Sequence, residues 1–230
     1  MLSLLVATQI AVGQFQLEGA VPPPWKVVPV GKKVPATQYR IVRLDGITGI
    51  EGTADRSMAL LGREMSADLS ATPILCWRWR IDAPVAGADL RTRKGDDFAA
   101  RVYVGFDIPD DQLARGIRFK LGLARRLTAS PIPDAAINYV WDNRYAIGTA
   151  VPNAFTDRAH MIVLQSGPAK AKMWQSQRAD VAQDFARAFP GVSGTAKLIA
   201  VAVDTDQTGG KAKGWFADIH FVSRSEPCRF

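Results

Sequence analysis

The sequence predicts an all-β domain, an antiparallel two-sheet sandwich of the jelly-roll type, for three reasons. Short segments alternate apolar and polar residues with a period of two, as half-buried strands do. Glycine, proline and aspartate separate these segments at the intervals typical of sandwiches and barrels. Only residues 180–190 have a clear helical period, because Val181, Phe185 and Phe189 lie at i, i+4 and i+8 before Pro190 and Gly191.

The strongest strand pattern is the segment in which Trp77, Trp79 and Ile81 alternate with Arg78 and Arg80. Residues 98–106 and 215–221 alternate in the same way, which predicts one core face and one polar face for each strand. Residues 161–164 and 198–203 are apolar on both faces, as central strands are. Residues 109–135 have no regular pattern, and we interpret them as an insertion between strands.

The chain has 230 residues, of which 47% are hydrophobic, enough for one sizeable core. We expect a single sandwich domain over residues 25–230 and a proline-rich leader over residues 14–24. Residues 1–13 are apolar and end in small residues before Gln14, which favours a short export signal. The alternative is that these residues form a first strand. No segment is long and apolar enough to predict a membrane span.

The formal net charge of +7 favours anionic partners, but no run of five basic residues occurs, so a nucleic-acid partner is not expected. The two cysteines, Cys76 and Cys228, are too few for a disulfide framework or a cysteine-based zinc site. They are either one buried thiol and one tail thiol, or a single bridge formed in an oxidising compartment.

A candidate binding face combines the polar sides of two strands, with Arg78 and Arg80 from one and Arg101 and Tyr103 from the other, beside Asp97. If the strands are neighbours, these side chains form one patch. Guanidinium groups suit carboxylates or sulfates, and aromatic rings stack on sugars. The alternative is a solvated face in which arginines and aspartates pair across strands.

Two further groups are candidates for ligand contacts. Trp141 is a candidate sugar platform with Asn153 further along the chain, although a core position for this ring is the alternative. Asp204, Asp206 and Thr208 precede two glycines, an oxygen-rich pattern that could hold Ca²⁺. An ordinary hairpin turn is the alternative, and no other cofactor is expected.

Catalytic motifs are absent from the sequence. His160 and His220 have no metal-ligand spacing, and no nucleophile elbow, P-loop or dinucleotide fingerprint occurs. Asp96 and Asp97 are adjacent, so on a strand they would point to opposite faces. No residue is therefore assigned a catalytic role.

The string from Gly95 to Val104, together with the Trp77–Arg80 segment, the Tyr139–Trp141 segment, Asn153 and the Asp204 loop, resembles the bacterial domain-of-unknown-function family DUF3047. Members of that family look like small exported proteins without an established activity. The resemblance covers about residues 25–222 and implies a periplasmic or secreted location. The closing Trp215–Ile219 pattern is also similar to galactose-binding-type jelly rolls and carbohydrate-binding modules, a likeness of fold alone.

The function expected from these observations is an exported binding module for a carbohydrate or another, possibly acidic, component of the cell envelope. A polysaccharide lyase or glycoside hydrolase that uses the same face is the first alternative. A structural envelope protein without a small-molecule site is the second.

Overall fold

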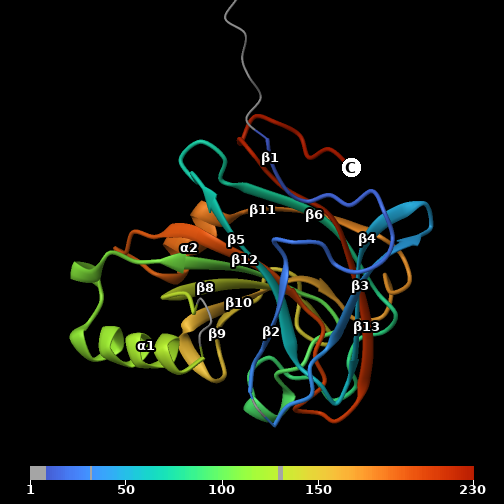
Figure 1. Ribbon diagram of the computed structural model, residues 1–230, viewed down its shortest axis with the longest axis horizontal. Helices are drawn as coiled ribbons and strands as arrows, with labels where there is room; N and C mark the ends of the chain where they lie inside the picture. The colour runs from blue at the N-terminus through green and yellow to red at the C-terminus, as the bar shows by residue number, and fades with distance from the viewer. Residues whose placement is uncertain (1–8, 32, 129–131) are drawn as a thin grey trace, which may run out of the picture.

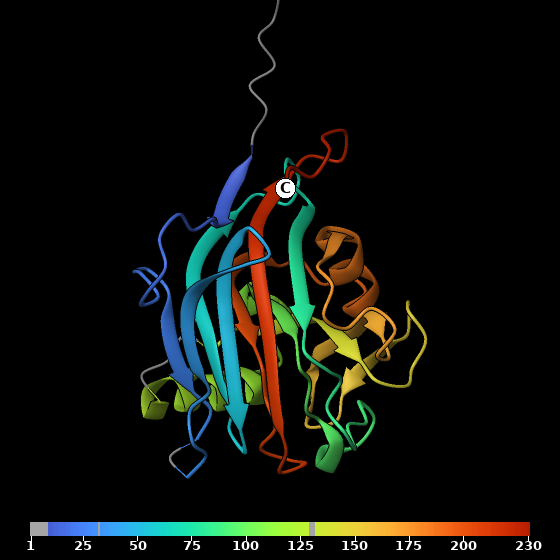
Figure 2. The ribbon, with the colours of Figure 1, turned by 90° about the vertical axis from the view of Figure 1, so that its right-hand side faces the viewer.

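The computed structural model describes residues 9–31, 33–128 and 132–230, which form two packed β-sheets (Figure 1). The six-stranded sheet has the order β11-β6-β13-β4-β3, and β1 also pairs with β13. Its strands are β1 (Ile10–Gly13), β3 (Gln38–Leu44), β4 (Ile47–Asp55), β6 (Ile74–Ile81), β11 (Gln175–Asp180) and β13 (Lys211–Val222). Figure 2 looks onto this sheet, with β13 in red near its centre.

The seven-stranded sheet has the order β2-β5-β12-β7-β8-β10-β9. Its strands are β2 (Lys26–Pro29), β5 (Ala59–Ala67), β7 (Arg101–Asp107), β8 (Ala135–Asp142), β9 (Ala150–Asn153), β10 (Thr156–Ser166) and β12 (Thr195–Ala202). The paired strands of both sheets run antiparallel, except that β8 and β10 are parallel. The predicted all-β sandwich is confirmed.

The core lies between the two sheets and is rich in aromatic rings. Trp77 and Trp79 are fully buried, as the alternation predicted. The ring of Trp77 lies 5.4 Å from that of Tyr139, and the ring of Trp79 lies 5.9 Å from that of Trp141. Trp141 is 1% exposed, and its indole N–H donates to the carbonyl oxygen of Gly167. The expectation that Trp141 forms a sugar platform is therefore wrong: it is a core residue.

The helix predicted near residues 180–190 is confirmed as α2 (Val181–Ala188). The Asp180 carboxylate caps it by accepting a 3.0 Å hydrogen bond from the Gln183 amide, and Val181 and Phe185 face the core. A second helix, α1 (Arg115–Thr128), lies in the segment interpreted as a patternless insertion. In Figures 1 and 2, α1 lies on the side of the seven-stranded sheet away from the six-stranded sheet. Two short 3₁₀ turns complete the elements, η1 (Arg93–Gly95) and η2 (Asp110–Gln112).

The N-terminal segment divides into two parts. Residues 1–8, which hold most of the expected export signal, lie outside the described residues. Residues 10–13 form β1, which pairs with β13 and buries Val12, as the first-strand alternative proposed. Cleavage before Gln14 would remove this strand, and export by such a signal stays a prediction.

The two cysteines form a disulfide that ties the C-terminal tail to the six-stranded sheet. Cys76 lies in β6 and Cys228 follows β13, so the bridge links residues 152 positions apart. Of the two alternatives left open by the sequence, the structure shows the bridge. Within the described residues, no helix is long and apolar enough to cross a membrane.

Candidate functional site

The predicted single patch does not exist, because its arginines lie in different sheets. Arg78 and Arg80 belong to β6 of the six-stranded sheet, whereas Arg101 and Tyr103 belong to β7 of the seven-stranded sheet. Arg78 forms an ion pair with Asp218 and Arg80 forms one with Asp45. These two arginines therefore fit the alternative interpretation, a sheet face on which charged residues pair with each other.

Arg101 was expected on an exposed face, but it is 3% exposed and its donors are all used. Its Nε atom donates to Asp204 at 2.8 Å, and Nη1 donates to Asp96 and to the Tyr103 hydroxyl, each at 3.2 Å. Nη2 donates to the Asp204 carboxylate and to the Asp96 carbonyl. The guanidinium carbon also lies 4.4 Å from the centre of the Phe98 ring. Arg101 thus holds loops together and has no donor left for a ligand.

The charge of Arg101 is fixed by its neighbours. Burial alone would lower the pKa of Arg101, but the carboxylates of Asp204 and Asp96 raise that pKa well above its usual value. Asp97 is fully buried, and its carboxylate accepts hydrogen bonds from the backbone amides of Gln207 and Thr208. Asp97 is therefore a cap for the 205–209 turn.

Asn153 contributes to the same polar cluster from the neighbouring edge of the sheet. Its side-chain amide donates to Asp96 at 3.0 Å, and its oxygen accepts from the Phe155 amide at 2.9 Å. Asn138 of β8 is also buried here, and its amide lies 3.1 Å from the Met161 sulfur. The structure thus brings Asp97, Arg101, Tyr103, Asn153 and the Asp204 loop together, although as a scaffold.

The predicted calcium loop places three carboxylates close together. One oxygen each from Asp97, Asp204 and Asp206 lies within 4.8 Å of the others. Asp204 is paired with Arg101 and Asp97 accepts from the turn amides, so much of their negative charge already has partners. The hydroxyl of Thr208 has no hydrogen-bond partner among the described residues. Cation binding at Asp204, Asp206 and Thr208 stays a prediction.

A melting experiment tests the calcium prediction. If Ca²⁺ binds the folded chain here, an excess of about a hundredfold over its dissociation constant adds about 2.7 kcal/mol to the free energy of unfolding. The melting temperature of the wild type should then be higher in CaCl₂ than in EDTA. The melting temperature of Asp206→Asn should be the same in both buffers. Identical melting temperatures for the wild type in both buffers would leave the loop as a turn held by Asp97.

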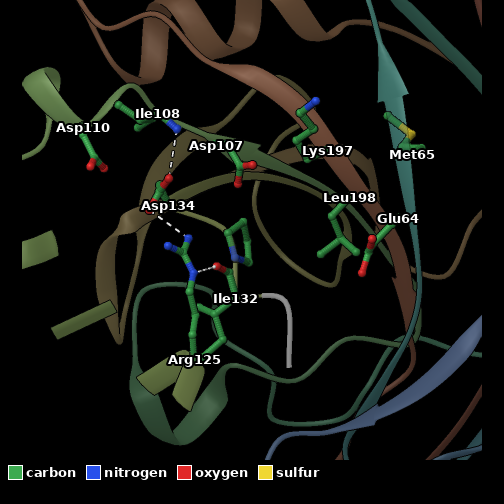
Figure 3. A pocket seen from close by; sticks show the side chains of 11 residues that line it. Glu64, Met65, Asp107, Ile108, Asp110, Arg125, Ile132, Asp134, Lys197 and Leu198 are labelled. Carbon is green, nitrogen blue, oxygen red and sulfur yellow. Dashed lines mark hydrogen bonds and ion pairs between the residues drawn. The ribbon is translucent and has the colours of Figure 1, made fainter. Parts of the chain in front are cut away.

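A cavity on the seven-stranded sheet lies further along the same face as Tyr103. It has a volume of about 800 Å³. Figure 3 shows the side chains that line it. Glu64 of β5, Leu198 of β12 and Gly105 of β7 are aligned across three neighbouring strands, and Asp107 lies two residues beyond Gly105. Because alternate residues of a strand share a face, Glu64 and Asp107 both project from the outer side of the sheet.

The opposite wall of this cavity comes from the segment that contains α1. Both walls together are lined by Glu64, Met65, Asp107, Ile108, Asp110, Arg125, Ile132, Pro133, Asp134, Lys197 and Leu198. Figure 3 shows how Asp134 fixes this wall: its carboxylate accepts from the Ile108 amide and from Arg125, each at 2.9 Å. Arg125 also donates to the Ile132 carbonyl at 2.7 Å.

The charged groups around the cavity differ in whether they have partners. Asp134 pairs with Arg125, and Asp110 pairs with Arg118 at 3.5 Å. Glu64, Asp107 and Lys197 have no hydrogen-bond or ion-pair partner among the described residues and are exposed. These three side chains can form hydrogen bonds to a ligand without breaking a bond to any other residue that the structure describes. Sequence reasoning missed them, because each is an ordinary polar residue on the exposed side of a strand.

The fold and this cavity define the chain as a β-sandwich with a polar pocket on the outer face of one sheet. The chain belongs to the protein family of unknown function DUF3047, whose family model matches residues 23–220. A comparison with curated proteins found no significant match.

Several solved structures have a similar overall fold at low sequence identity. The family 11 carbohydrate-binding module of the Clostridium thermocellum cellulase Lic26A-Cel5E is 8% identical, with a TM-score of 0.46 over 97% of this chain and 99% of that chain. Endoglucanase 3 of Trichoderma harzianum, from family GH12, is 9% identical, with a TM-score of 0.43 over 96% of this chain and 99% of that chain. The xyloglucanase domain of NopAA from Sinorhizobium fredii is 10% identical, with a TM-score of 0.42 over 87% of this chain and 93% of that chain.

Proposed function

We propose that the chain is an exported module that binds a carbohydrate in the cavity on the outer face of the seven-stranded sheet. The observation that carries this proposal is the combination of apolar walls, which include Leu198 and Pro133, with Glu64, Asp107 and Lys197, three polar side chains that have no partner among the described residues. A sugar ring offers hydroxyl groups around its edge and C–H groups on its faces. Carboxylates and an ammonium group match the hydroxyls, and the apolar side chains match the faces.

The charge of the cavity bears on the kind of sugar. Of the described residues, four acidic and two basic ones line it, so this lining does not share the positive charge of the whole chain. Like charges repel at short range, so an acidic sugar would meet unfavourable contacts with Glu64 and Asp107. The pocket therefore supports a neutral, hydroxyl-rich ligand better than the acidic one that the net charge favoured.

Export belongs to the same proposal. A disulfide persists in oxidising compartments such as the bacterial periplasm or the extracellular space, and Cys76 and Cys228 are bridged. We therefore place the module in the periplasm or outside the cell. Fractionation of cells that express the full chain tests this, and recovery of the protein in the cytoplasm with both thiols reduced would contradict it.

Glu64→Gln and Asp107→Asn should each weaken carbohydrate binding about tenfold or more, because a hydrogen bond to a charged group contributes about 1.5–3 kcal/mol. A screen over neutral, acidic and amino-sugar oligosaccharides identifies a ligand, and calorimetric titration then compares the variants. Asp82→Asn removes an exposed charge outside the cavity and serves as the control. Equal affinities for the wild type and both pocket variants would contradict the proposed site.

A glycoside hydrolase is the second candidate function, favoured by the two carboxylates that face one pocket. β12 lies between β5 and β7, and Asp107 lies two residues beyond the position level with Glu64, so the backbones at these two residues are about 12 Å apart and the side chains can approach each other more closely. Inverting glycosidases hold their two carboxyl groups about 6.5–9.5 Å apart, with a water molecule between them. Release of reducing ends by the wild type, abolished in Glu64→Gln, would establish hydrolysis in place of simple binding.

A further inference from the structure

An irregularity in β13 places a histidine beside the disulfide, on the sheet opposite the proposed carbohydrate pocket. Ala217 pairs with Arg78, but the next residues to pair are His220 and Cys76. β13 therefore uses three residues where β6 uses two, which is a β-bulge. Asp218 in this bulge has a φ of 55°, a conformation that is sterically unfavourable for a residue with a side chain. Without the extra residue, Ile219 would lie opposite Cys76.

Because of the bulge, His220 and not Ile219 lies opposite Cys76 of the disulfide. β-Bulges commonly reorient a side chain in this way. His220 is fully buried, and one ligand atom each from Cys76, Cys228 and His220 lies within 4.8 Å of the others. Ile74 and Val222 pack with Cys76 in a small apolar cluster, and Cys228 lies against it partly buried. The result is a cluster of two sulfurs and one imidazole nitrogen that is buried on the side of Cys76 and His220 and partly exposed at Cys228.

The hydrogen bonds of His220 fix its tautomer. Nδ1 lies 2.5 Å from the carbonyl oxygen of Asp218, which can only accept, so Nδ1 carries the proton and donates. Nε2 accepts from the backbone amide of Arg229, the residue after Cys228, at 3.2 Å. Burial also lowers the pKa of His220, which favours the neutral imidazole. A histidine that binds a metal ion through one nitrogen commonly donates its other N–H to a carbonyl in this manner.

We propose that Cys76, Cys228 and His220 form a redox-gated site for a thiophilic metal ion, Cu(I) or Zn(II), which becomes available when the disulfide is reduced. A dithiol reductant supplies two electrons and two protons, so that the S–S bond breaks, two cysteine thiols form and the reductant becomes a disulfide. Metal binding then releases the thiol protons to solvent, and the two thiolates and Nε2 coordinate the ion. Two cysteines alone are too few for a zinc site, but thiolate and imidazole are both ligands that these ions prefer, and His220 supplies the third ligand.

The oxidised chain cannot bind the ion in this way, because both sulfurs are held in the S–S bond. The reduced chain can adjust its ligands, because Cys228 lies in the tail beyond the last strand. The hydrogen bond from the Arg229 amide to Nε2 has to give way, and the two sulfurs have to move apart. Oxidation would reform the bridge and release the ion, so the oxidation state of the cysteines controls occupancy.

The test measures metal binding by the full chain in its two oxidation states. The reduced protein, freed of excess reductant under anaerobic conditions, is titrated with Cu(I) against a chromogenic chelator and, separately, with Zn(II). We expect one equivalent of Cu(I) or Zn(II) per reduced chain and none for the oxidised chain. His220→Gln should weaken binding about tenfold or more, since it removes a ligand, whereas His160→Gln, at the other histidine, should match the wild type.

Circular dichroism of each sample establishes whether the sandwich persists after reduction. Cys228→Ser opens the bridge through a change in the tail alone and should bind the ion more weakly than the reduced wild type. Equal binding by the oxidised and reduced chains, equal losses in the two histidine variants, or unfolding on reduction would each overturn the proposal. None of these outcomes depends on whether a carbohydrate binds the opposite sheet.

Discussion

Replacing Arg101 with methionine is expected to lower the free energy of unfolding by about 3–5 kcal/mol, the usual cost of removing one partner from a buried ion pair. Asp204 is 1% exposed and Asp96 is 8% exposed, and both carboxylates would lose the guanidinium group that neutralises them. Methionine fills a similar volume, so lost packing contributes little. The destabilisation would come from carboxylates left buried without a positive charge.

Urea denaturation of the wild type and Arg101→Met measures this difference. Arg56→Met is the matched control: Arg56 also pairs with an aspartate, Asp55, but both side chains are more than two-fifths exposed. Exposed ion pairs contribute about 0–1 kcal/mol, so this control should unfold close to the wild type. Similar losses in the two variants would show that the buried network around Arg101 has no special role in stability.

Trp141→Ala is expected to destabilise the chain by about 3–5 kcal/mol, as large-to-small substitutions of buried aromatic residues do. The ring packs against Trp79 between the sheets. Loss of the indole N–H would also leave the Gly167 carbonyl without its hydrogen-bond donor. If Trp141 were instead a sugar platform on the surface, the same substitution would abolish ligand binding at little cost in stability.

The matched control is Phe155→Ala, because Phe155 is an aromatic residue with 48% of its surface exposed. This variant should unfold within about 0.5 kcal/mol of the wild type, as surface substitutions usually do. Thermal and urea unfolding of both variants decide the matter. A Trp141→Ala protein as stable as Phe155→Ala would contradict the packing of the two sheets described above.

The strands could be predicted because alternation reports directly which side chains of one strand share a face. Trp77 and Trp79 were assigned to the core on that ground, and both are fully buried. Alternation does not report which sheet a strand joins. Arg78 and Arg101 each lie on the polar side of a strand, but the strands belong to different sheets, so the predicted patch could not form.

The remaining errors have similar causes. α1 was missed because glycines and many basic residues interrupt its pattern, although Ile117, Leu121 and Arg125 recur every four residues on the partly buried side of the helix. Arg101 was expected to be exposed because no local pattern shows that Asp96, Phe98 and the Asp204 loop cover it. The pocket residues gave no signal either, since only strand pairing aligns Glu64 with Leu198 and Gly105.

The most direct test of carbohydrate recognition is to map the ligand onto the sheets. Amide chemical shifts of the labelled chain are recorded during titration with an oligosaccharide identified by screening. We expect shifts that saturate together and cluster around Glu64, Asp107, Lys197 and Asp134, with the six-stranded sheet unaffected. Shifts centred on Arg78, Arg80 and Trp215, or no shifts with any saccharide, would contradict this expectation.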